Sequence, residues 1–282
     1  MAEQPARKAP SATEAQVVRT ERITPHMVRV VLGGPGLDGF DAGTYTDHYV
    51  KLLFAPEGVT YPEPFDMERI RSERPREEWP TTRTYTVRAW DPVHRELTLD
   101  FVVHGDEGLA GPWAARARVG ETVRFLGPGG GYAPDPAADW HLLVGDESAL
   151  PAIGAALERL PAGATVHAFV EIEDAADEQK FATEAGVEVT WLHRAGRPVG
   201  EALVEAVRGL DFPAGDVHAF VHGEAGFVKE LRRHLRMERQ VDRERLSISG
   251  YWRLGKTDEA WRAIKREWNE QVEREQEPQQ TA

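Results

Sequence analysis

The pattern of the chain changes near residue 137, and this change constrains the fold more than any single motif does. Before it, short runs rich in β-branched and aromatic residues are separated by turns that contain glycine or proline. After it, short apolar runs alternate with segments whose apolar residues recur at helical spacing. The first pattern is typical of an antiparallel sheet, and the second of a parallel sheet covered by helices. Two domains of different classes are therefore expected, and 282 residues accommodate both.

The first domain, residues 14–137, is predicted to be an antiparallel Greek-key β-barrel with one helix. Strands are expected at 17–22, 27–32, 48–54, 82–90, 96–104 and 120–126, and the helix at 112–118. A two-residue turn, Pro92-Val93 or Val93-His94, is expected to join two strands as a hairpin, and residues 127–131 to end the last strand. Residues 1–13 are predicted to be disordered, and the Pro-rich, charged residues 55–81 to form an excursion with one short helix.

The second domain, residues 138–282, is predicted to be an open parallel sheet with flanking helices. Strands are expected at 141–144, 165–170, 187–191, 217–221 and 245–249, and helices at 149–160, 201–207 and 226–237. A strongly charged final helix at 257–276 carries an apolar stripe of Ala260, Trp261, Ile264 and Trp268. This helix either packs on the sheet or docks an electron donor.

Composition excludes several classes of function. The chain has no cysteine, which rules out disulfides, a cysteine nucleophile, a thiol relay and cysteine-ligated iron–sulfur clusters. The ten histidines are scattered without ligand spacing, so no metal site is expected. A net charge of −13 disfavours nucleic acid and anionic membrane as partners, and no apolar run approaches the roughly 20 residues that span a bilayer. The first residues lack the apolar stretch of a secretory signal, so a cytoplasmic location is expected.

The run Arg83-Thr84-Tyr85-Thr86 begins a predicted strand that is central to the functional interpretation. Alternation sends Arg83 and Tyr85 to one face of the strand, and Thr84 and Thr86 to the other. An arginine, an aromatic ring and a hydroxyl suit the pyrophosphate, the ring system and the polar ring edge of a flavin nucleotide. An exposed strand of ordinary composition is the alternative, since short motifs recur by chance.

A glycine-containing loop in the same domain favours the nucleotide interpretation. Residues 105–111 lead into the predicted helix, whose first N–H groups have no partners within the helix and attract phosphate. The strand and the loop together fit a dinucleotide that lies across the barrel.

Several short motifs, which follow one another along the chain, carry a more specific resemblance to a known protein family. They are Arg83-Thr-Tyr-Thr86, Asp100-Phe-Val-Val-His104-Gly105, Gly108-x-Ala110-x-x-Trp113-Ala114, Gly145-Asp-Glu-Ser-Ala-Leu-Pro151, Trp191-x-His-Arg194 and Gly250-Tyr-Trp-Arg253. Over residues 14–268 the chain resembles the siderophore-interacting protein family, flavin-dependent ferric-siderophore reductases related to ferredoxin–NADP reductases. Two departures stand in one motif. The family usually has Gly-Pro-Ala-Ser or Gly-Pro-Ala-Thr where this chain has Leu109 and Gly111, so a phosphate-binding hydroxyl is missing.

The resemblance implies how FAD is held. Arg83 would bind the pyrophosphate, Tyr85 would pack on the flavin or ribityl, Thr86 would lie near N5 and Thr84 would give backbone contacts. The residues expected to line the adenine or ring side are Asp100, Phe101, Val103 and His104, and those expected beside the pyrophosphate are Ala110, Gly111 and Ala114. Trp252 either covers one flavin face or belongs to the core, and for His104 a satisfied strand-end histidine is the alternative.

The nicotinamide nucleotide is expected at Asp146-Glu147-Ser148, which follows the first strand of the second domain. In an open α/β sheet, ligands bind at the carboxyl ends of strands. A simple helix cap is the alternative, and there is no Gly-x-Gly-x-x-Gly motif. The acids Glu171, Glu173 and Asp174 favour NADH, whereas Arg194 and Arg197 are able to reverse that preference, which stays open.

Lys51, Arg253 and Lys256 are expected to anchor an anionic ferric siderophore beside the flavin. Because the whole chain carries −13, such an anion needs a local basic cluster. The alternatives are an outward-facing solvated lysine and a charged helix entry.

The expected activity is reduction of siderophore-bound Fe(III) to Fe(II) by a monomeric enzyme. Electrons pass from NADH or NADPH through FAD, with ferredoxin as an alternative donor, and no catalytic acid, base or nucleophile is needed. Two other functions stay open, a general flavin or ferredoxin-linked reductase and a carrier that binds ferric siderophore without turnover.

Overall fold

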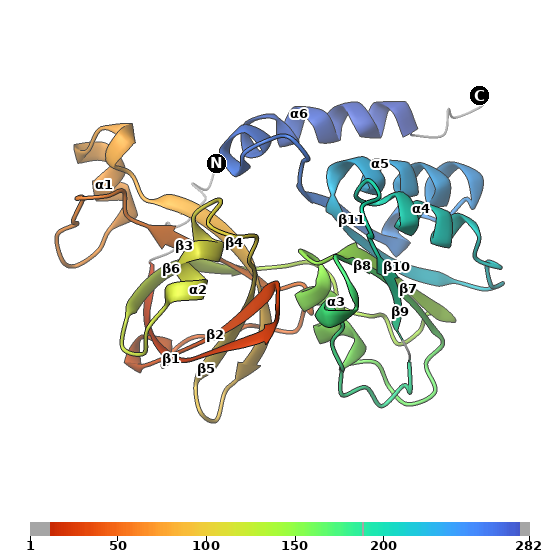
Figure 1. The fold of residues 1–282 in the computed structure, drawn as a ribbon, viewed down its shortest axis with the longest axis horizontal. Helices are drawn as coiled ribbons and strands as arrows, with labels where there is room; N and C mark the ends of the chain where they lie inside the picture. Colours follow the sequence, from red (N-terminus) through yellow and green to blue (C-terminus); the bar gives the residue numbers. More distant parts are fainter. Residues whose placement is uncertain (1–11, 188, 277–282) are drawn as a thin grey trace, which may run out of the picture. The chain divides into compact units, whose positions relative to one another are not determined.

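The computed structural model describes residues 12–187 and 189–276 and divides the chain into two compact units (Figure 1). The first runs to Ile23 and then from Met27 to Gly130, and the second contains Thr24–His26 and the chain from Gly131 onward. Of the tail predicted to be disordered, residues 1–11 lie outside the described residues, whereas Thr13 already belongs to the first strand.

The first unit is a closed antiparallel barrel with strand order β1-β2-β5-β4-β3-β6, which confirms the predicted architecture. Its strands are β1 (Thr13–Thr24), β2 (Met27–Gly33), β3 (Tyr49–Phe54), β4 (Thr81–Asp91), β5 (Glu96–Val102) and β6 (Thr122–Gly129). Two helices accompany them, α1 (Met67–Glu73) in the predicted excursion and α2 (Ala110–Arg116). Alternating residues of the strands fill the barrel, with Leu52, Leu99 and Phe101 wholly buried.

Three local expectations for the barrel were wrong. The hairpin between β4 and β5 has four connecting residues, 92–95, because the Asp91 side chain accepts the N–H groups of Val93 (2.8 Å) and His94 (3.0 Å) and builds a wider turn. β5 ends at Val102 and not at His104. β6 continues to Gly129, which pairs with Tyr49, because the absent side chain leaves room for the Tyr49 ring.

The helix α2 begins two residues earlier than expected. Pro112 was taken as the start, yet it occupies the third helical position, where a missing N–H costs no intrahelical bond. Ala110 and Ala114 face the barrel core, so the helix closes one end of the barrel.

The second unit is a parallel sheet, as predicted, and its strand order is β11-β10-β7-β8-β9. Its strands are β7 (Trp140–Asp146), β8 (Val166–Ile172), β9 (Val189–His193), β10 (Val217–Glu224) and β11 (Leu246–Trp252). Its helices are α3 (Leu150–Leu157), α4 (Glu201–Arg208), α5 (Ala225–Arg233) and α6 (Asp258–Gln276). Residue 188, inside the strand predicted at 187–191, lies outside the described residues.

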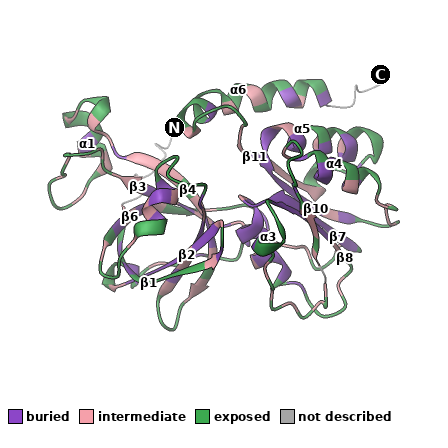
Figure 2. Ribbon diagram, viewed as in Figure 1, coloured by how far each residue is buried: buried purple, intermediate pink, exposed green. Residues whose placement is uncertain are grey.

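Helices cover both faces of this sheet, and its central strands β7, β8 and β10 are largely buried (Figure 2). Leu142 and Val144 of β7 pack against α4 and α5, whereas the intervening Leu143 points to the face that α3 covers. The chain moves outward from β7 to β9 and then returns to place β10 on the other side of β7. The switch point between β7 and β10 is where open α/β sheets bind ligands.

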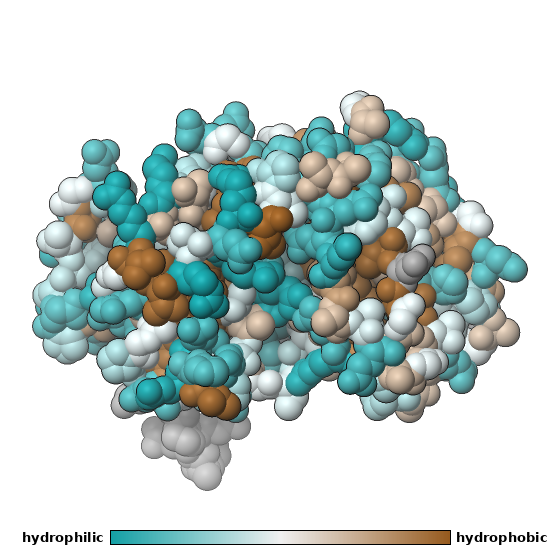
Figure 3. Space-filling view, turned by 60° about the horizontal axis from the view of Figure 1, so that its bottom comes forward, coloured by the Kyte–Doolittle hydropathy of each residue, from teal (hydrophilic) through white to brown (hydrophobic). Residues whose placement is uncertain are grey.

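In the last helix, α6, the predicted stripe is only partly buried, because Trp261 is buried while Ala260 is exposed. Trp261 and Val272 are buried, but Ile264 is 39% exposed. The Gln276 side chain, bonded to the Lys229 carbonyl (3.0 Å), ties the end of α6 to α5. No helix in the described ranges combines the length and apolar character that crossing a bilayer requires. The face drawn in Figure 3 is largely hydrophilic, with apolar side chains in small separate groups.

Candidate functional site

Arg83 and Tyr85 lie on β4 with their neighbours on β3 directly opposite. Arg83 pairs with Leu52 and Tyr85 with Val50, both of which point into the barrel, so the two candidate side chains share that face as predicted. Each is half-buried, and Arg83 Nη1 donates to the Thr82 carbonyl at 3.1 Å. The strand therefore presents a guanidinium and an aromatic ring at one end of an apolar wall.

The ring of Tyr85 is held by an aromatic cluster that also contacts α2. Its centroid lies 4.2 Å from that of Phe101, and Trp113 of α2 meets both Phe101 (5.5 Å) and Phe54 (5.7 Å). Trp113 Nε1 donates to Glu121 at 2.6 Å, which fixes the indole. Edge-to-face and tilted ring pairs of this kind stabilise one orientation of each ring.

Gly111 lies in the first turn of α2, close to the end of β5. A Cβ at this position would lie 2.9 Å from the Val102 carbonyl oxygen, so the helix packs too closely on the strand for any larger residue. A serine or threonine here, as the resemblance leads one to expect, would therefore require the helix or the strand to shift. Leu109 at the N-cap of α2 has no polar side chain and makes no capping hydrogen bond to the first N–H groups of the helix.

Strict alternation along β4 ends at a bulge. The pairing with β5 slips between Val87 and Ala89. Thr86 precedes this slip, pairs with Tyr49 of β3 and is buried on the face opposite to that of Val87. Thr86 therefore has little exposed surface, while Thr84 is exposed on the outer face.

Most of the other residues predicted to line FAD form the wall behind these groups. Phe101, Val103, Ala110 and Ala114 are buried in the barrel core or against it. Asp100 is also buried, and its two oxygens accept from Arg29 Nε (2.7 Å) and Nη2 (2.8 Å). His104 is exposed. The Arg29 partner was missed in the sequence, although its place on the neighbouring strand β2, opposite Asp100, is a readable signal.

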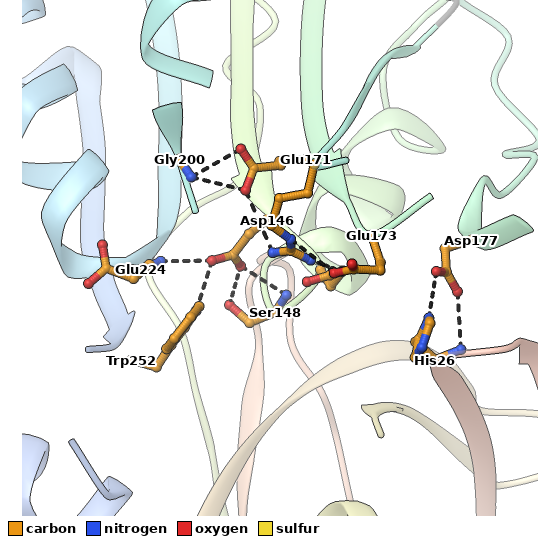
Figure 4. Close-up of polar contacts among 11 residues, drawn as sticks. His26, Asp146, Ser148, Glu171, Glu173, Asp177, Gly200, Glu224 and Trp252 are labelled. Carbon is orange, nitrogen blue, oxygen red and sulfur yellow. Dashed lines mark hydrogen bonds and ion pairs between the residues drawn. The ribbon is translucent and has the colours of Figure 1, made fainter. Parts of the chain in front are cut away.

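In the second unit, Asp146 ends β7 and is a buried centre of hydrogen bonds (Figure 4). Its Oδ1 accepts the N–H (2.9 Å) and the hydroxyl (2.5 Å) of Ser148, and its Oδ2 accepts the N–H of Glu224 (2.8 Å) and the indole N–H of Trp252 (2.8 Å). Burial raises the pKa of this carboxyl, and the donated hydrogen bonds oppose the rise. Asp146 thus joins the ends of β7, β10 and β11.

Glycines allow these strand ends to approach one another. A Cβ on Gly145 would lie 2.5 Å from the Ala149 Cβ, and one on Gly223 would lie 2.7 Å from the Asp146 carboxyl. Gly223 also has φ 141°, a conformation that side chains disfavour. The glycine–acid pairs Gly145-Asp146 and Gly223-Glu224 are the sequence signal for this junction, and the role of Glu224 was missed.

Glu147 is buried beside a shared cation. Its Oε1 lies 2.5 Å from Arg194 Nη2, and the same guanidinium reaches Glu171 (3.6 Å) and Glu173 (3.1 Å). Burial raises the pKa of Glu147 to about 7, and the charge of Arg194 limits the rise. Burial also raises the pKa of Glu171, whose two oxygens accept the Gly200 N–H (2.9 and 3.0 Å).

The three cations predicted to hold the substrate belong to different units. Lys51 faces outward on β3, opposite Thr84, with its Nζ 5.8 Å from the Tyr49 ring centroid. Arg253 Nη1 lies 3.2 Å from Oε1 of Glu224, which also caps α5, and the Arg253 side chain stays 39% exposed. Lys256 is exposed.

Two family models match the chain in succession. The model described as siderophore-interacting FAD-binding domain covers residues 16–132, and the one described as siderophore-interacting protein covers residues 138–255. Among solved structures, a siderophore utilization protein from T. fusca is 38% identical with a TM-score of 0.77, covering 89% of this chain and 96% of its own.

Curated relatives span the same length. An uncharacterized protein of Mycobacterium tuberculosis is 47% identical over 89% of this chain and 94% of its own. Ferric vibriobactin reductase of Vibrio cholerae is 34% identical, covering 86% and 90%. The NADPH-dependent ferric-chelate reductase of Escherichia coli is also 34% identical, covering 85% and 92%. With an FAD-binding barrel followed by the matching parallel sheet, this chain belongs to the siderophore-interacting protein family.

Proposed function

We propose that the chain is a ferric-siderophore reductase that uses FAD to pass electrons from a reduced nicotinamide nucleotide to siderophore-bound Fe(III), releasing Fe(II) in the cytoplasm. The proposal rests on two features that occur together in this member of the family. One is the barrel wall with Arg83 and Tyr85, and the other is the switch point of the sheet at Asp146. The first suits an anionic aromatic cofactor, and the second suits a nucleotide.

The residues on the barrel wall fit FAD chemically. Arg83 supplies a cation for pyrophosphate, and the Tyr85 ring, held by Phe101, supplies a flat surface for stacking. FAD, when bound, accepts a hydride from the nicotinamide and passes electrons on singly. The protein has to position these groups and exclude competing reactions.

The substrate proposal rests on charge. A ferric siderophore with anionic oxygen donors meets a chain of net charge −13, so local cations are needed to attract it. Lys256 is exposed and Lys51 partly exposed, so both are able to supply such charge, and Arg253 does so while it holds Glu224. Reduction releases the iron because hard oxygen donors hold Fe(III) more tightly than Fe(II).

The test is turnover by purified protein reconstituted with FAD. We expect about one flavin per chain, with absorbance near about 450 nm, and capture of Fe(II) by a ferrous chelator when NADH or NADPH is supplied with ferric siderophore. Flavin reduction without Fe(II) from hydroxamate, catecholate or mixed chelates would instead assign a general flavin reductase. A chain that binds ferric siderophore but no FAD would be a carrier, and turnover with reduced ferredoxin alone would change the donor.

A further inference from the structure

Arg194 follows β9 and is wholly occupied by carboxylates. Its side chain is 10% exposed, and its three guanidinium nitrogens face Glu147 (2.5 Å), Glu173 (3.1 Å) and Glu171 (3.6 Å). Three acids face one cation here, and because burial raises the pKa of Glu147 to about 7 and also raises that of Glu171, the charge of the group near neutral pH is less negative than the formal −2. Arg194 therefore organises acidic side chains and is not available to a further anion.

The next arginine is occupied in the same way. Arg197 Nη2 lies 2.7 Å from Glu205, and its Nε lies 3.4 Å from Glu201. In the segment after β8, residues 173–180, the sequence places four acids beside one lysine, Lys180. Arg194 and Arg197, the two cations that the sequence suggests for binding a 2′-phosphate, are thus paired with acids, and Lys180 is outnumbered by the acids around it in the sequence.

The position of Glu173 matters because of the topology. β8 lies next to β7, whose end forms part of the switch point, and Glu173 is the first residue beyond the end of β8. In nucleotide-binding α/β sheets, an acid at the end of this second strand bonds the adenosine ribose 2′-hydroxyl of NAD, whereas an arginine there accommodates the 2′-phosphate of NADP. The Glu173 side chain is held by Arg194 yet 49% exposed, so it is oriented and accessible.

We propose that Glu173, oriented by Arg194, makes this chain select NADH over NADPH. The inference rests on the proposed function and deepens it by naming the donor. A 2′-phosphate would bring about −1.5 to −2 charges to this acidic edge, whereas a free ribose 2′-hydroxyl donates a hydrogen bond to the carboxylate. The selection separates this chain from its relative in Escherichia coli, which is named for NADPH.

The test compares two adenosine fragments that differ only in the 2′-phosphate. Dissociation constants of 5′-AMP and 2′,5′-ADP for the FAD-loaded protein are measured by saturation-transfer NMR at low ionic strength, which detects weak binding. We expect 5′-AMP to bind at least about tenfold more tightly. In Glu173→Gln this ratio falls at least about fivefold, because a negative charge leaves and Arg194 loses a partner. In the control Glu178→Gln, whose carboxylate pairs with His193 (2.8 Å) and not with Arg194, the ratio stays within about twofold.

A second readout is the rate of flavin reduction by each donor. NADH should reduce the wild-type flavin at least about tenfold more efficiently than NADPH, with the preference shrinking at high salt because the discrimination is electrostatic. Equal or tighter binding of 2′,5′-ADP, or an unchanged ratio in Glu173→Gln, overturns the role of Glu173 while leaving ferric-siderophore reduction intact. If neither nucleotide reduces the flavin, the proposed donor fails and the inference fails with it.

Discussion

Arg83 on the barrel wall and Arg194 at the sheet edge both lie beside proposed nucleotide sites, but their surroundings differ. Arg83 stands opposite the apolar Leu52 and donates to a backbone carbonyl, whereas Arg194 faces three carboxylates. In the proposed function the barrel cation binds a ligand, whereas the cation of the second unit holds three acids of its own unit in place. Loss of Arg83 should therefore reduce ligand binding. Loss of a charged side chain in the second unit should mainly reduce stability or specificity.

The largest effect is expected from Arg83→Ala. Removing a partly buried cation from a pyrophosphate should weaken FAD binding by about 3–4 kcal/mol, or roughly 200- to 1000-fold. Flavin content after purification and fluorescence titration with FAD measure this. Arg19→Ala is the matched control, because Arg19 lies on the same barrel with its side chain 58% exposed and paired to Glu96. If Arg83→Ala purifies yellow with about one flavin per chain, the role given to Arg83 is wrong.

Asp146→Ala tests the second unit, where a charged side chain is expected to support stability. It leaves the N–H groups of Ser148, Glu224 and Trp252 without their acceptor, so we expect a loss of about 2–3 kcal/mol in stability. The melting temperature should fall by about 4–12 °C, Trp252 fluorescence should change, and FAD affinity should hold. Asp211→Ala, at an exposed position of the same unit, should change none of these. A stable variant with unchanged fluorescence would show that the junction of strand ends does not depend on Asp146.

Lys51→Ala and Arg253→Ala compare one cation from each unit. Each should raise KM for ferric siderophore about fivefold and leave FAD bound, because each removes one charge from substrate attraction. Only Arg253→Ala should also lower the melting temperature, since it strips Glu224 of its ion pair. If KM is unchanged in both variants, the anchoring role of these cations is refuted.

The smallest expected effect is the change in the stability of the second unit as the pH is lowered. Burial lowers the pKa of His218 to about 4 and of His222 to about 3, so these second-unit side chains stay neutral while the unfolded chain takes up protons below about pH 6.5. Their contribution to stability is therefore complete above about pH 6.5 and is lost as the pH falls. Glu147, with its raised pKa, works in the opposite direction, destabilising the fold as the pH rises from about 4.5 to about 7.

A single substitution isolates the histidine contribution. His218→Asn keeps an acceptor near the Nδ1 that bonds the Asp135 N–H at 3.0 Å, and it cannot be protonated. The drop in melting temperature from about pH 7 to about pH 5 should be smaller in this variant than in the wild type, by about 2–4 °C. Identical drops would remove His218 from the account of acid sensitivity.

The sequence predicted the architecture of both units but misplaced the ends of several strands and one helix. The change of period near residue 137 and the alternation at Arg83 and Tyr85 were sufficient for both architectures and for the shared face of these side chains. The hairpin loop, the extension of β6 and the start of α2 were misjudged, because each is decided by one contact, such as the Asp91 side chain closing its own turn.

The candidate site was predicted as residue types but not as pairs. The sequence predicted that Glu173 and Arg194 follow neighbouring strands and that they have opposite effects on the choice between NADH and NADPH. Only the fold shows that the two side chains are bonded to each other. Asp146 was predicted as a ligand contact or a cap, and the structure shows bonds to three segments, two of them far away in the sequence. Such long-range partners leave no periodic trace in a chain.

One anaerobic experiment tests the central claim most directly. FAD-loaded protein is reduced with one equivalent of NADH and then mixed with ferric siderophore and a ferrous chelator, while both the flavin and the Fe(II) complex are followed. The account predicts that absorbance near about 450 nm returns as about two Fe(II) form per flavin, at a rate that rises with siderophore concentration. A flavin that stays reduced, with no Fe(II) formed above the level of free FADH₂ in solution, would contradict it.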